Sequence, residues 1–414
     1  MWARGISLAA QRHNRPPVAG ENITGRLLLG FLWAAAITAC LAFLTNQNLL
    51  PEGPDKWTYD WRTYFFSERA AGQRDDIAML VINEDTMADY PYIVADRGLL
   101  AAIVRALGEA HAKAIGLDFV FERPTEPSKD EALIRAIRSS TIPVVLGAID
   151  PRAHLATRHS LDFQRDFFDN AGVSALGRVR AGHVILSRRP DLLTAGDQIV
   201  RFISPPFNSD PSFESFARVL AEADGPKPPL HSDYIDWLLP PSNAEETFAT
   251  VVVPEHKPLT NFENTASILP SSMRSLLKGK IVLVGAEFVD RDLHLTPLSV
   301  ADKRAVPGVT IQAQIVAQIR DGRSVTGLAL WQQSVVVFLL ACVGYILGWR
   351  ARLHQYATAT HFISIVILAA VGFLVFEHLK LIIPTTALLF GWLAGVIGGH
   401  YSGSVLGLFG RRHV

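Results

Sequence analysis

The segment "IAMLVINEDTMADYPYIVADRGLLAAIVRALGEAHAKAIGLDFVF", residues 77–121, decides the fold class of this chain. It begins and ends with short apolar runs, "IAMLVI" (77–82) and "AIGLDFVF" (114–121), which are typical of buried strands. Between them, behind a possible cap at Asp96, apolar residues recur on one helical face. They are Leu99, Leu100, Ile103, Val104 and Leu107. This order predicts a strand, a helix and a second strand of a parallel sheet with covering helices.

The same alternation continues along the chain. "SKDEALIRAIRSS" (128–140) predicts a helix with a cap at Ser128, and "IPVVLGA" (142–148) predicts a third strand. Later, "KIVLVG" (280–285) predicts another strand and "PGVTIQAQIVAQIRDG" (307–322) predicts a helix. We therefore expect an α/β domain, three-layer-like in its packing, with a mainly parallel or mixed sheet.

The middle of this domain, residues 151–258, is less regular and rich in proline. Candidate strands lie at 182–187, 198–204 and 233–239, and one candidate helix lies near 213–221. We expect this part to be antiparallel or rich in loops.

Membrane spans account for a hydrophobic content of 49% in 414 residues. Four stretches lack Asp, Glu, Lys and Arg and are long enough to cross a bilayer as helices. They are residues 27–45, 328–349, 357–376 and 381–399. The first is longer than the apolar core of a signal peptide and continues past Cys40. We therefore prefer an uncleaved helix to a cleaved signal peptide or a lipid-attached Cys40.

The arginines predict the orientation of these helices. They precede the first span, lie between the second and third, and follow the fourth, as Arg4, Arg12, Arg15, Arg26, Arg350, Arg352, Arg411 and Arg412. By the positive-inside rule the tails 1–26 and 400–414 are cytoplasmic, and residues 46–327 form a domain on the far side. The only cysteines, Cys40 and Cys342, lie in predicted spans, so this domain has no disulfide.

Several segments together resemble the type 2 CHASE domains (cyclase/histidine-kinase-associated sensory extracellular domains). They are "YDWR" (59–62), "LVINEDTMADYPY" (80–92), "AIGLDFVFERP" (114–124), "AGHVILSRRPDLLTAGDQIVRF" (181–202), "LKGKIVLVGAEFVDRDLHLTPL" (277–298) and "PGVTIQAQIVAQIRDGR" (307–323). The resemblance covers about residues 55–325 in the expected order. It implies a bacterial inner-membrane sensor with a periplasmic domain, one helix before the domain and three after it.

The chain departs from the family pattern at three places. Asn83 stands where members usually have Asp, and Gln312 stands where they usually have His. Members typically continue into a cyclase or kinase, whereas "HYSGSVLGLFGRRHV" (400–414) ends this sequence. We expect no fused output domain, so the implied partner is a separate kinase or cyclase, or an envelope protein.

Polar side chains at the ends of the predicted strands form the candidate ligand site, because ligands of open α/β sheets bind at the carboxyl ends of the strands. The candidate residues are Asn83, Glu84, Arg97, Asp118, His183, Arg201, Asp292 and His294. No catalytic residue and no metal ligand is assigned among them.

Each candidate has an alternative role. Asp290, Asp292 and His294 suit a metal or phosphate site, but we prefer a structural loop in which Asp292 caps amides or pairs with Arg97 or Arg201. His183 is a pH sensor or a neutral member of a buried pair, and we prefer the pair. Asp118 either has a buried arginine or amide partner or contacts a ligand.

Other chemistry finds no support in the sequence. It contains no Gly-rich phosphate loop, nucleophile elbow or paired metal-binding histidines, and no basic aromatic stretch suited to nucleic acid. Gly391, Gly395 and Gly399 share one helical face and predict packing within the monomer or a homodimer. We predict a sensor that is not an enzyme and has no cofactor. The alternatives are a scaffolding subunit of an envelope complex and, less favoured, a metal-dependent periplasmic hydrolase.

Overall fold

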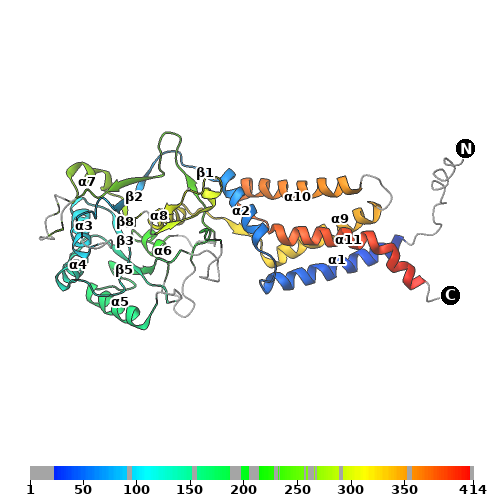
Figure 1. The fold of residues 1–414 in the computed structure, drawn as a ribbon, viewed down its shortest axis with the longest axis horizontal. Helices are drawn as coiled ribbons and strands as arrows, with labels where there is room; N and C mark the ends of the chain where they lie inside the picture. The colour runs from blue at the N-terminus through cyan, green and yellow to red at the C-terminus, as the bar shows by residue number, and fades with distance from the viewer. Residues whose placement is uncertain are drawn as a thin grey trace, which may run out of the picture. The chain divides into compact units, whose positions relative to one another are not determined.

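The structure is a computed structural model, and its helices and strands carry the labels of Figure 1. The residues that it describes are 23–90, 96–151, 156–186, 197–204, 214–227, 232, 234–255, 258–259, 265, 268–288, 292–351 and 357–410. The chain divides into two compact units. The helical unit comprises Met1–Asp55, Leu328–Leu374 and Ile383–Val414, and the sheet unit comprises Lys56–Gly327 and Val375–Ile382.

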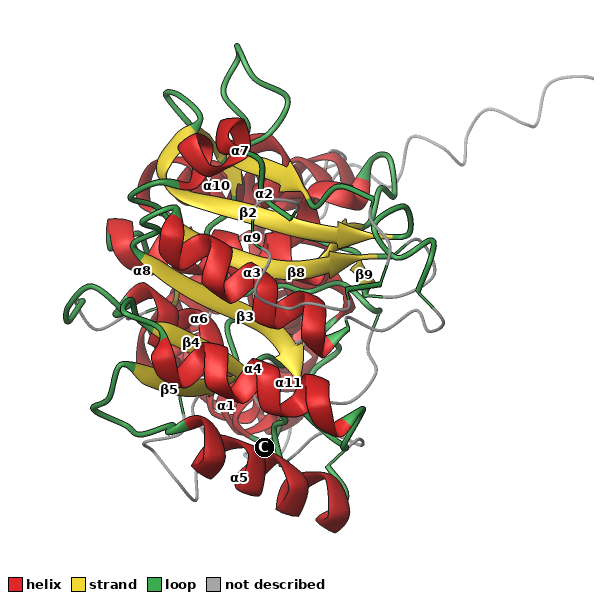
Figure 2. Cartoon of the chain, turned by 90° about the vertical axis from the view of Figure 1, so that its left-hand side faces the viewer, coloured by secondary structure: helices red, strands yellow, loops and turns green. Residues whose placement is uncertain are grey.

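A six-stranded sheet forms the centre of the sheet unit. Its strands are β2 (Arg74–Asn83), β3 (Ala114–Val120), β4 (Val144–Ala148), β5 (Val179–His183), β7 (Phe248–Val252) and β8 (Ile281–Glu287). They lie in the order β5-β4-β3-β8-β2-β7, and every neighbouring pair is parallel (Figure 2). The predicted α/β class and the mainly parallel sheet are therefore confirmed.

Helices pack on both faces of this sheet because its strands are apolar on both. In β2, Ala78, Leu80 and Ile82 join one buried cluster, and the alternate residues Ile77, Met79 and Val81 join the other. The first cluster takes in α3 (Arg97–Glu109), α4 (Pro127–Ser139), α5 (Arg158–Ala171) and α7 (Ser271–Leu277). The second takes in α6 (Phe216–Ala221) and α8 (Gly308–Asp321).

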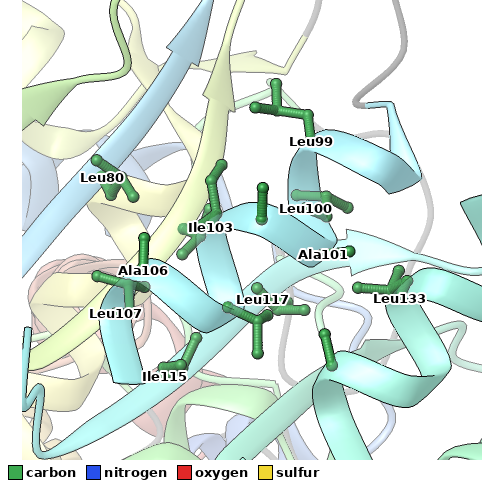
Figure 3. Close-up of a cluster of buried hydrophobic side chains, with 14 of the residues drawn as sticks. Leu80, Leu99, Leu100, Ala101, Ile103, Ala106, Leu107, Ile115, Leu117 and Leu133 are labelled. Carbon is green, nitrogen blue, oxygen red and sulfur yellow. The ribbon is translucent and has the colours of Figure 1, made fainter. Parts of the chain in front are cut away.

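The predicted helix at the start of this fold is α3. Asp96 caps it, because the Asp96 carboxylate accepts hydrogen bonds from the backbone N–H groups of Gly98 at 2.9 Å and Leu99 at 3.1 Å. Its apolar side chains lie against the strands and against Leu133 of α4 (Figure 3). Residues 77–121 thus form the crossover unit that their apolar spacing predicts.

The middle of the domain differs from the prediction. Residues 198–204 and 233–239 form only isolated bridges and β6 (Leu238–Leu239), which pairs with β1 (Glu68–Arg69). The same part of the chain supplies both edge strands, β5 and β7, in parallel rather than antiparallel pairing. It also supplies α5, a helix that begins with a capping box of Thr157 and Ser160 and whose polar sequence did not predict it. Non-local pairing decides these elements, so local pattern does not reveal them.

The helical unit contains four long helices, α1 (Ile23–Asn46), α9 (Leu330–Ala351), most of α10 (Ala357–Leu379) and α11 (Thr385–Gly410). Among the described residues, three segments are long and apolar enough to cross a membrane, judged by length and composition: Ile23–Asn46, Leu330–Arg350 and His361–Leu379. The predicted span at 381–399 begins differently. Leu381–Ile382 form β12, paired with β11 (Thr326–Gly327), and the helix starts only after Pro384, which suits a helix start.

The glycine face of α11 packs against α9. A Cβ placed on Gly395 would overlap the backbone of Ala341, and one on Gly399 would overlap the backbone of Tyr345. The absent side chains let the two helix backbones approach closely. Packing within the monomer is therefore confirmed for this face, which α9 occupies.

Short elements complete the fold. They are α2 (Gly53–Phe66), β9 (Leu293–His294), the 3-10 helix η2 (Pro297–Val300) and β10 (Val306–Pro307). The end of α10 and β12, Val375–Ile382, also belong to the sheet unit, where Phe376 and Ile382 share a buried cluster with Tyr59 and Val325. The sheet unit thus extends beyond the predicted domain of residues 46–327.

Candidate functional site

Three of the predicted site residues meet at the carboxyl end of the sheet. Asp118 lies near the end of β3, which pairs with β8, and the chain beyond β8 leads to Asp292 and to His294 of β9 (Figure 2). His294 Nε2 lies 3.1 Å from Asp292 Oδ1. The charge of Asp292 also acts on the Asp118 carboxyl. The structure thus joins residues that lie far apart in the sequence.

Asp118 is partly buried, and the pKa of its carboxyl is shifted upward. Burial raises the pKa of its carboxyl well above the ordinary value, and the negative charge of Asp292 raises it further. Among the described residues, no hydrogen-bond donor or positive charge contributes to this pKa. The expected arginine or amide partner of Asp118 is therefore not found in the described part of the chain.

Asp292 connects this site to the start of α8. Its backbone is in the left-handed region, with φ of 58°, and its carbonyl accepts a hydrogen bond of 3.0 Å from the N–H of Gly308. A Cβ on Gly308 would lie 2.9 Å from each carboxylate oxygen of Asp292, so a larger residue there would displace the Asp292 carboxylate. A carboxylate beside the first turn of a helix also interacts favourably with the helix dipole.

His294 supplies the third polar group. Its side chain is 18% exposed, and its Nδ1 is buried without a hydrogen-bond partner among the described residues. Asp290, which completes the predicted metal or phosphate site, lies outside the described residues. Within the residues that the structure describes, no group of three or more His, Cys, Asp or Glu side chains is arranged to hold a metal ion. Two carboxyl groups and an imidazole suit a cationic ligand or one rich in hydrogen-bond donors.

Asn83 and Glu84 lie at the same edge of the sheet, at the end of β2. Asn83 pairs in register with Glu287, and its Oδ1 accepts hydrogen bonds from Thr86 N at 2.9 Å and Thr86 Oγ1 at 3.0 Å. Glu84 is exposed. Burial raises the pKa of Glu287, and the negative charges of Glu246 and Glu84 contribute. Asn83 fixes a turn, and this edge is acidic.

Arg97, the first residue of α3, has a buried side chain and a carboxylate partner on α4. Its Nη1 donates to Asp130 Oδ1 at 2.7 Å, and its side chain is 7% exposed. Its guanidinium lies 5.3–5.5 Å from three ring centroids, those of Phe121, Phe163 and Phe167. Such a cation–π arrangement stabilises a desolvated guanidinium. Arg97 therefore has a structural role at the junction of α3 and α4.

Arg201 lies in a separate cluster of charges with Asp60 and Asp197. Its Nε and Nη2 donate to the two Asp60 oxygens at 2.7 and 2.6 Å, and its Nη1 and Nη2 donate to the Asp197 oxygens at 2.9 and 2.6 Å. Arg201 is 1% and Asp60 4% exposed. The expected pairing of Asp292 with Arg97 or Arg201 is wrong, because each arginine has other carboxylate partners.

His183 is completely buried at the end of the edge strand β5. Its Nδ1 lies 3.8 Å from Asp150 Oδ2, and both side chains are 0% exposed. β4 separates β5 from β3 in the sheet. His183 and Asp150 are thus buried neighbours, and they are not part of the Asp118 cluster.

Two buried glutamines on α8, Gln314 and Gln318, are structurally important residues that the sequence analysis did not single out. Gln314 exchanges two hydrogen bonds with the backbone of Leu238, at 3.0 and 2.9 Å. Gln318 accepts from Asp236 N at 2.8 Å and donates to Tyr234 O at 3.0 Å. Gln312 donates to Val184 O at 3.0 Å. The four-residue spacing of Gln314 and Gln318 on one helical face was the available signal.

Lys380 is another residue that the sequence analysis did not single out. Its Nζ donates to the Phe66 carbonyl at 2.9 Å and lies 3.8 Å from Asp236 Oδ1. Asp236 also pairs with Arg323, which follows α8, at 3.1 Å. The segment after α10 is thereby linked to the segment after α8 within the sheet unit.

Comparison with known proteins gives one match. The model of the CHASE2 domain family matches residues 34–348. A search of curated proteins and a search of solved structures found no match to this chain.

Proposed function

The chain belongs to the CHASE2 domain family, a family of sensory extracellular domains, and from this membership we propose that it is a sensor of the bacterial inner membrane. CHASE2 domains generally work with cyclase or histidine-kinase effectors. In this proposal the sheet unit is the three-layer periplasmic sensor. Four helices cross the membrane, with α11 as the fourth, and both termini are cytoplasmic because the arginines cluster there. The effector is a separate protein.

One observation carries the proposal beyond family membership: the sheet unit includes the hairpin between α10 and α11. Val375–Ile382 pairs with Thr326–Gly327 through β12 and β11, and it contributes Phe376 to the cluster around Tyr59. Lys380 joins it to Phe66 and Asp236. Besides the chain connection from α1 into α2, the sensor is therefore connected to the helices through β11 into α9 and through this hairpin.

α8 is the element that connects the candidate ligand site to these exits. Asp292 contacts its first residue, Gly308, and Arg323 pairs with Asp236 just beyond its last residue, Asp321. A ligand that changes the position of Asp292 acts on the start of this helix. The mechanism is a population shift in which ligand or partner favours one position of α8.

The ligand that the site favours carries positive charge or hydrogen-bond donors. Asp118 and Asp292 provide two carboxyl groups, and the Nδ1 of His294 has no partner among the described residues. We propose binding rather than catalysis for this site. The eight candidate residues therefore divide into ligand contacts, Asp118, Asp292 and His294, with Asn83 and Glu84 on the same edge, and the structural residues Arg97, His183 and Arg201.

The test is affinity purification of the full-length protein from its native membrane, followed by mass spectrometry of proteins and retained small molecules. We expect a stoichiometric kinase or cyclase. Recovery of envelope proteins alone, with no ligand, supports a scaffolding subunit instead. Bound metal together with hydrolytic activity supports the hydrolase alternative.

Coupling is tested in the same complex with Lys380→Met. This variant should retain the effector but lose the response of its activity to ligand. The matched control is Lys113→Met, because Lys113 lies in the same unit, is 43% exposed and pairs with Asp224 at 2.7 Å. Equal responses of both variants contradict the role of the hairpin.

A further inference from the structure

α2, the helix that follows α1, has two different faces. One face is packed into the protein, and the buried residues of α2 are Thr58, Tyr59, Asp60, Arg62 and Thr63. The other face carries large apolar side chains in contact with solvent. Trp57 is 61% exposed, Phe65 59% and Tyr64 37%. Large exposed aromatic residues gathered on one face mark a surface that another phase or molecule covers.

The exposed Trp57, Tyr64 and Phe65 form a continuous aromatic stripe together with the half-buried Trp61. Their spacing of four, seven and eight residues places them on one face of a helix. The rings touch along the helix: Trp57 lies 6.3 Å from Trp61, and Trp61 lies 5.8 Å from Tyr64 and 5.5 Å from Phe65. The stripe contains no charged residue.

Both ends of α2 are bonded to segments that flank apolar helices. At the first end, Asp55 Oδ1 accepts a hydrogen bond of 2.8 Å from the N–H of Thr386, in the first turn of α11. At the other end, the Phe66 carbonyl accepts a hydrogen bond of 2.9 Å from Lys380, just after α10. α1 ends at Asn46, shortly before α2 begins at Gly53. α2 is thus bonded to segments that directly adjoin the proposed spans α10 and α11, and the chain enters it shortly after α1.

We propose that the aromatic stripe of α2 lies in the headgroup region of the lipid bilayer, so that the sensory domain is seated on the membrane surface. Trp and Tyr are the residues that favour this region, since each combines an apolar ring with a polar group. A helix with one apolar face lies in the plane of the interface. The inference rests on the proposed membrane placement of α1, α10 and α11, and continuity with them favours lipid over a protein partner.

This placement gives the membrane a direct contact with the core of the sensor. Tyr59 and Asp60 belong to the buried residues of α2. Asp60 pairs with Arg201, and the Tyr59 hydroxyl donates to the Ile235 carbonyl at 3.1 Å. Movement of α2 with the packing of the lipid surface therefore acts on the same segment that α8 holds through Gln318 and Asp236.

The test measures the depth of a spin label in lipid. Cys40 and Cys342 are replaced by alanine, and Phe65→Cys or Trp57→Cys is introduced into the full-length protein. The labelled protein is reconstituted into phosphatidylcholine and phosphatidylglycerol vesicles. Collision rates with oxygen, which concentrates in lipid, and with a water-soluble nickel complex then report the depth. Both positions should lie about 5–10 Å into the boundary between headgroups and acyl chains.

Two control positions separate this inference from the proposed function. Leu176, 101% exposed in the sheet unit, should report water, and Phe362, 68% exposed in α10, should report the bilayer interior. If Phe362→Cys reports water, the membrane placement itself is wrong. If Phe362→Cys reports lipid and both α2 labels match Leu176→Cys, only the interfacial helix is refuted. Labels shielded from both quenchers mean that a protein covers the stripe, which also overturns the proposal.

Discussion

Replacement of Arg201 by methionine is the sharpest test of the buried charge cluster. The substitution preserves much of the side-chain length but leaves the Asp60 carboxylate, 4% exposed, without the bidentate partner at 2.7 and 2.6 Å. Asp197 loses the same partner, but its side chain is 41% exposed and regains water. The substitution should therefore lower the free energy of unfolding by about 3–5 kcal/mol, because it leaves one buried charge uncompensated.

Hydrogen exchange of the full-length protein in nanodiscs, followed by mass spectrometry, measures this loss within the sheet unit. Peptides from β3 and β8 should exchange between about a hundredfold and about three thousandfold faster, since every 1.4 kcal/mol is about tenfold. The matched control is Arg135→Met. Arg135 is 63% exposed and lies 3.2 Å from Glu131, which is 68% exposed. Arg135→Met should therefore lower the free energy of unfolding by less than about 1 kcal/mol.

The pH dependence of Arg201→Met has a definite sign. Burial already raises the pKa of Asp60 and Arg201 opposes the rise, so removal of Arg201 raises this pKa further. A carboxyl whose pKa is raised by folding adds stability below its unfolded value, near 4, and loses it as pH rises through the folded value. The penalty should be greatest at pH 8 and shrink toward pH 5, after correction for intrinsic exchange rates. A penalty no larger than that of Arg135→Met at every pH refutes the buried pair.

Three further substitutions test the site and the packing. Asp118→Asn should flatten the fall of thermal stability as pH rises from about 4, because burial and a neighbouring carboxylate raise the pKa of Asp118; an unchanged slope contradicts this. Gly395→Ala should cost about 1–3 kcal/mol by overlapping the backbone of Ala341, whereas Gly108→Ala, with open space around it, should stabilise α3 by up to about 1 kcal/mol. Gln318→Leu removes the partner of the Asp236 N–H at a cost of about 1–3 kcal/mol, while the Tyr234 carbonyl keeps its hydrogen bond from Ser232 Oγ; the loss should appear as faster exchange in the segment around Asp236.

The crossover unit of β2, α3 and β3 was predictable because its information is local. Apolar spacing marks the strands and the helix, and Asp96 marks the start of the helix. The edge strands β5 and β7 were not predictable in this way. Their place depends on pairing with β4 and β2, which lie far away in the sequence. The same reason explains why β12, Leu381–Ile382, was taken as the start of a span: it pairs with β11, which lies far away in the sequence.

Part of the candidate site was predictable from one rule, that polar groups at the carboxyl ends of parallel strands converge. The rule placed Asp118 with Asp292 and His294, since β3 and β8 are neighbours. It does not tell which charged residues already have partners. Arg201 and Asp60 are 141 positions apart in the sequence, and only the three-dimensional structure reveals that they pair.

The candidate arginines already have carboxylate partners, and for this reason we propose that a ligand binds at the acidic edge of the sheet instead. Arg97 and Arg201, the buried arginines among the candidates, are satisfied by carboxylates, so binding a ligand there requires breaking a desolvated pair. Asp118 has no such partner among the described residues, and burial together with the charge of Asp292 raises the pKa of its carboxyl. A cationic ligand or a hydrogen-bond donor beside Asp118 lowers this pKa, so its binding favours the ionised carboxylate. In the proposed mechanism Asp292 passes this change to α8, because its backbone carbonyl accepts a hydrogen bond from the N–H of Gly308, the first residue of that helix.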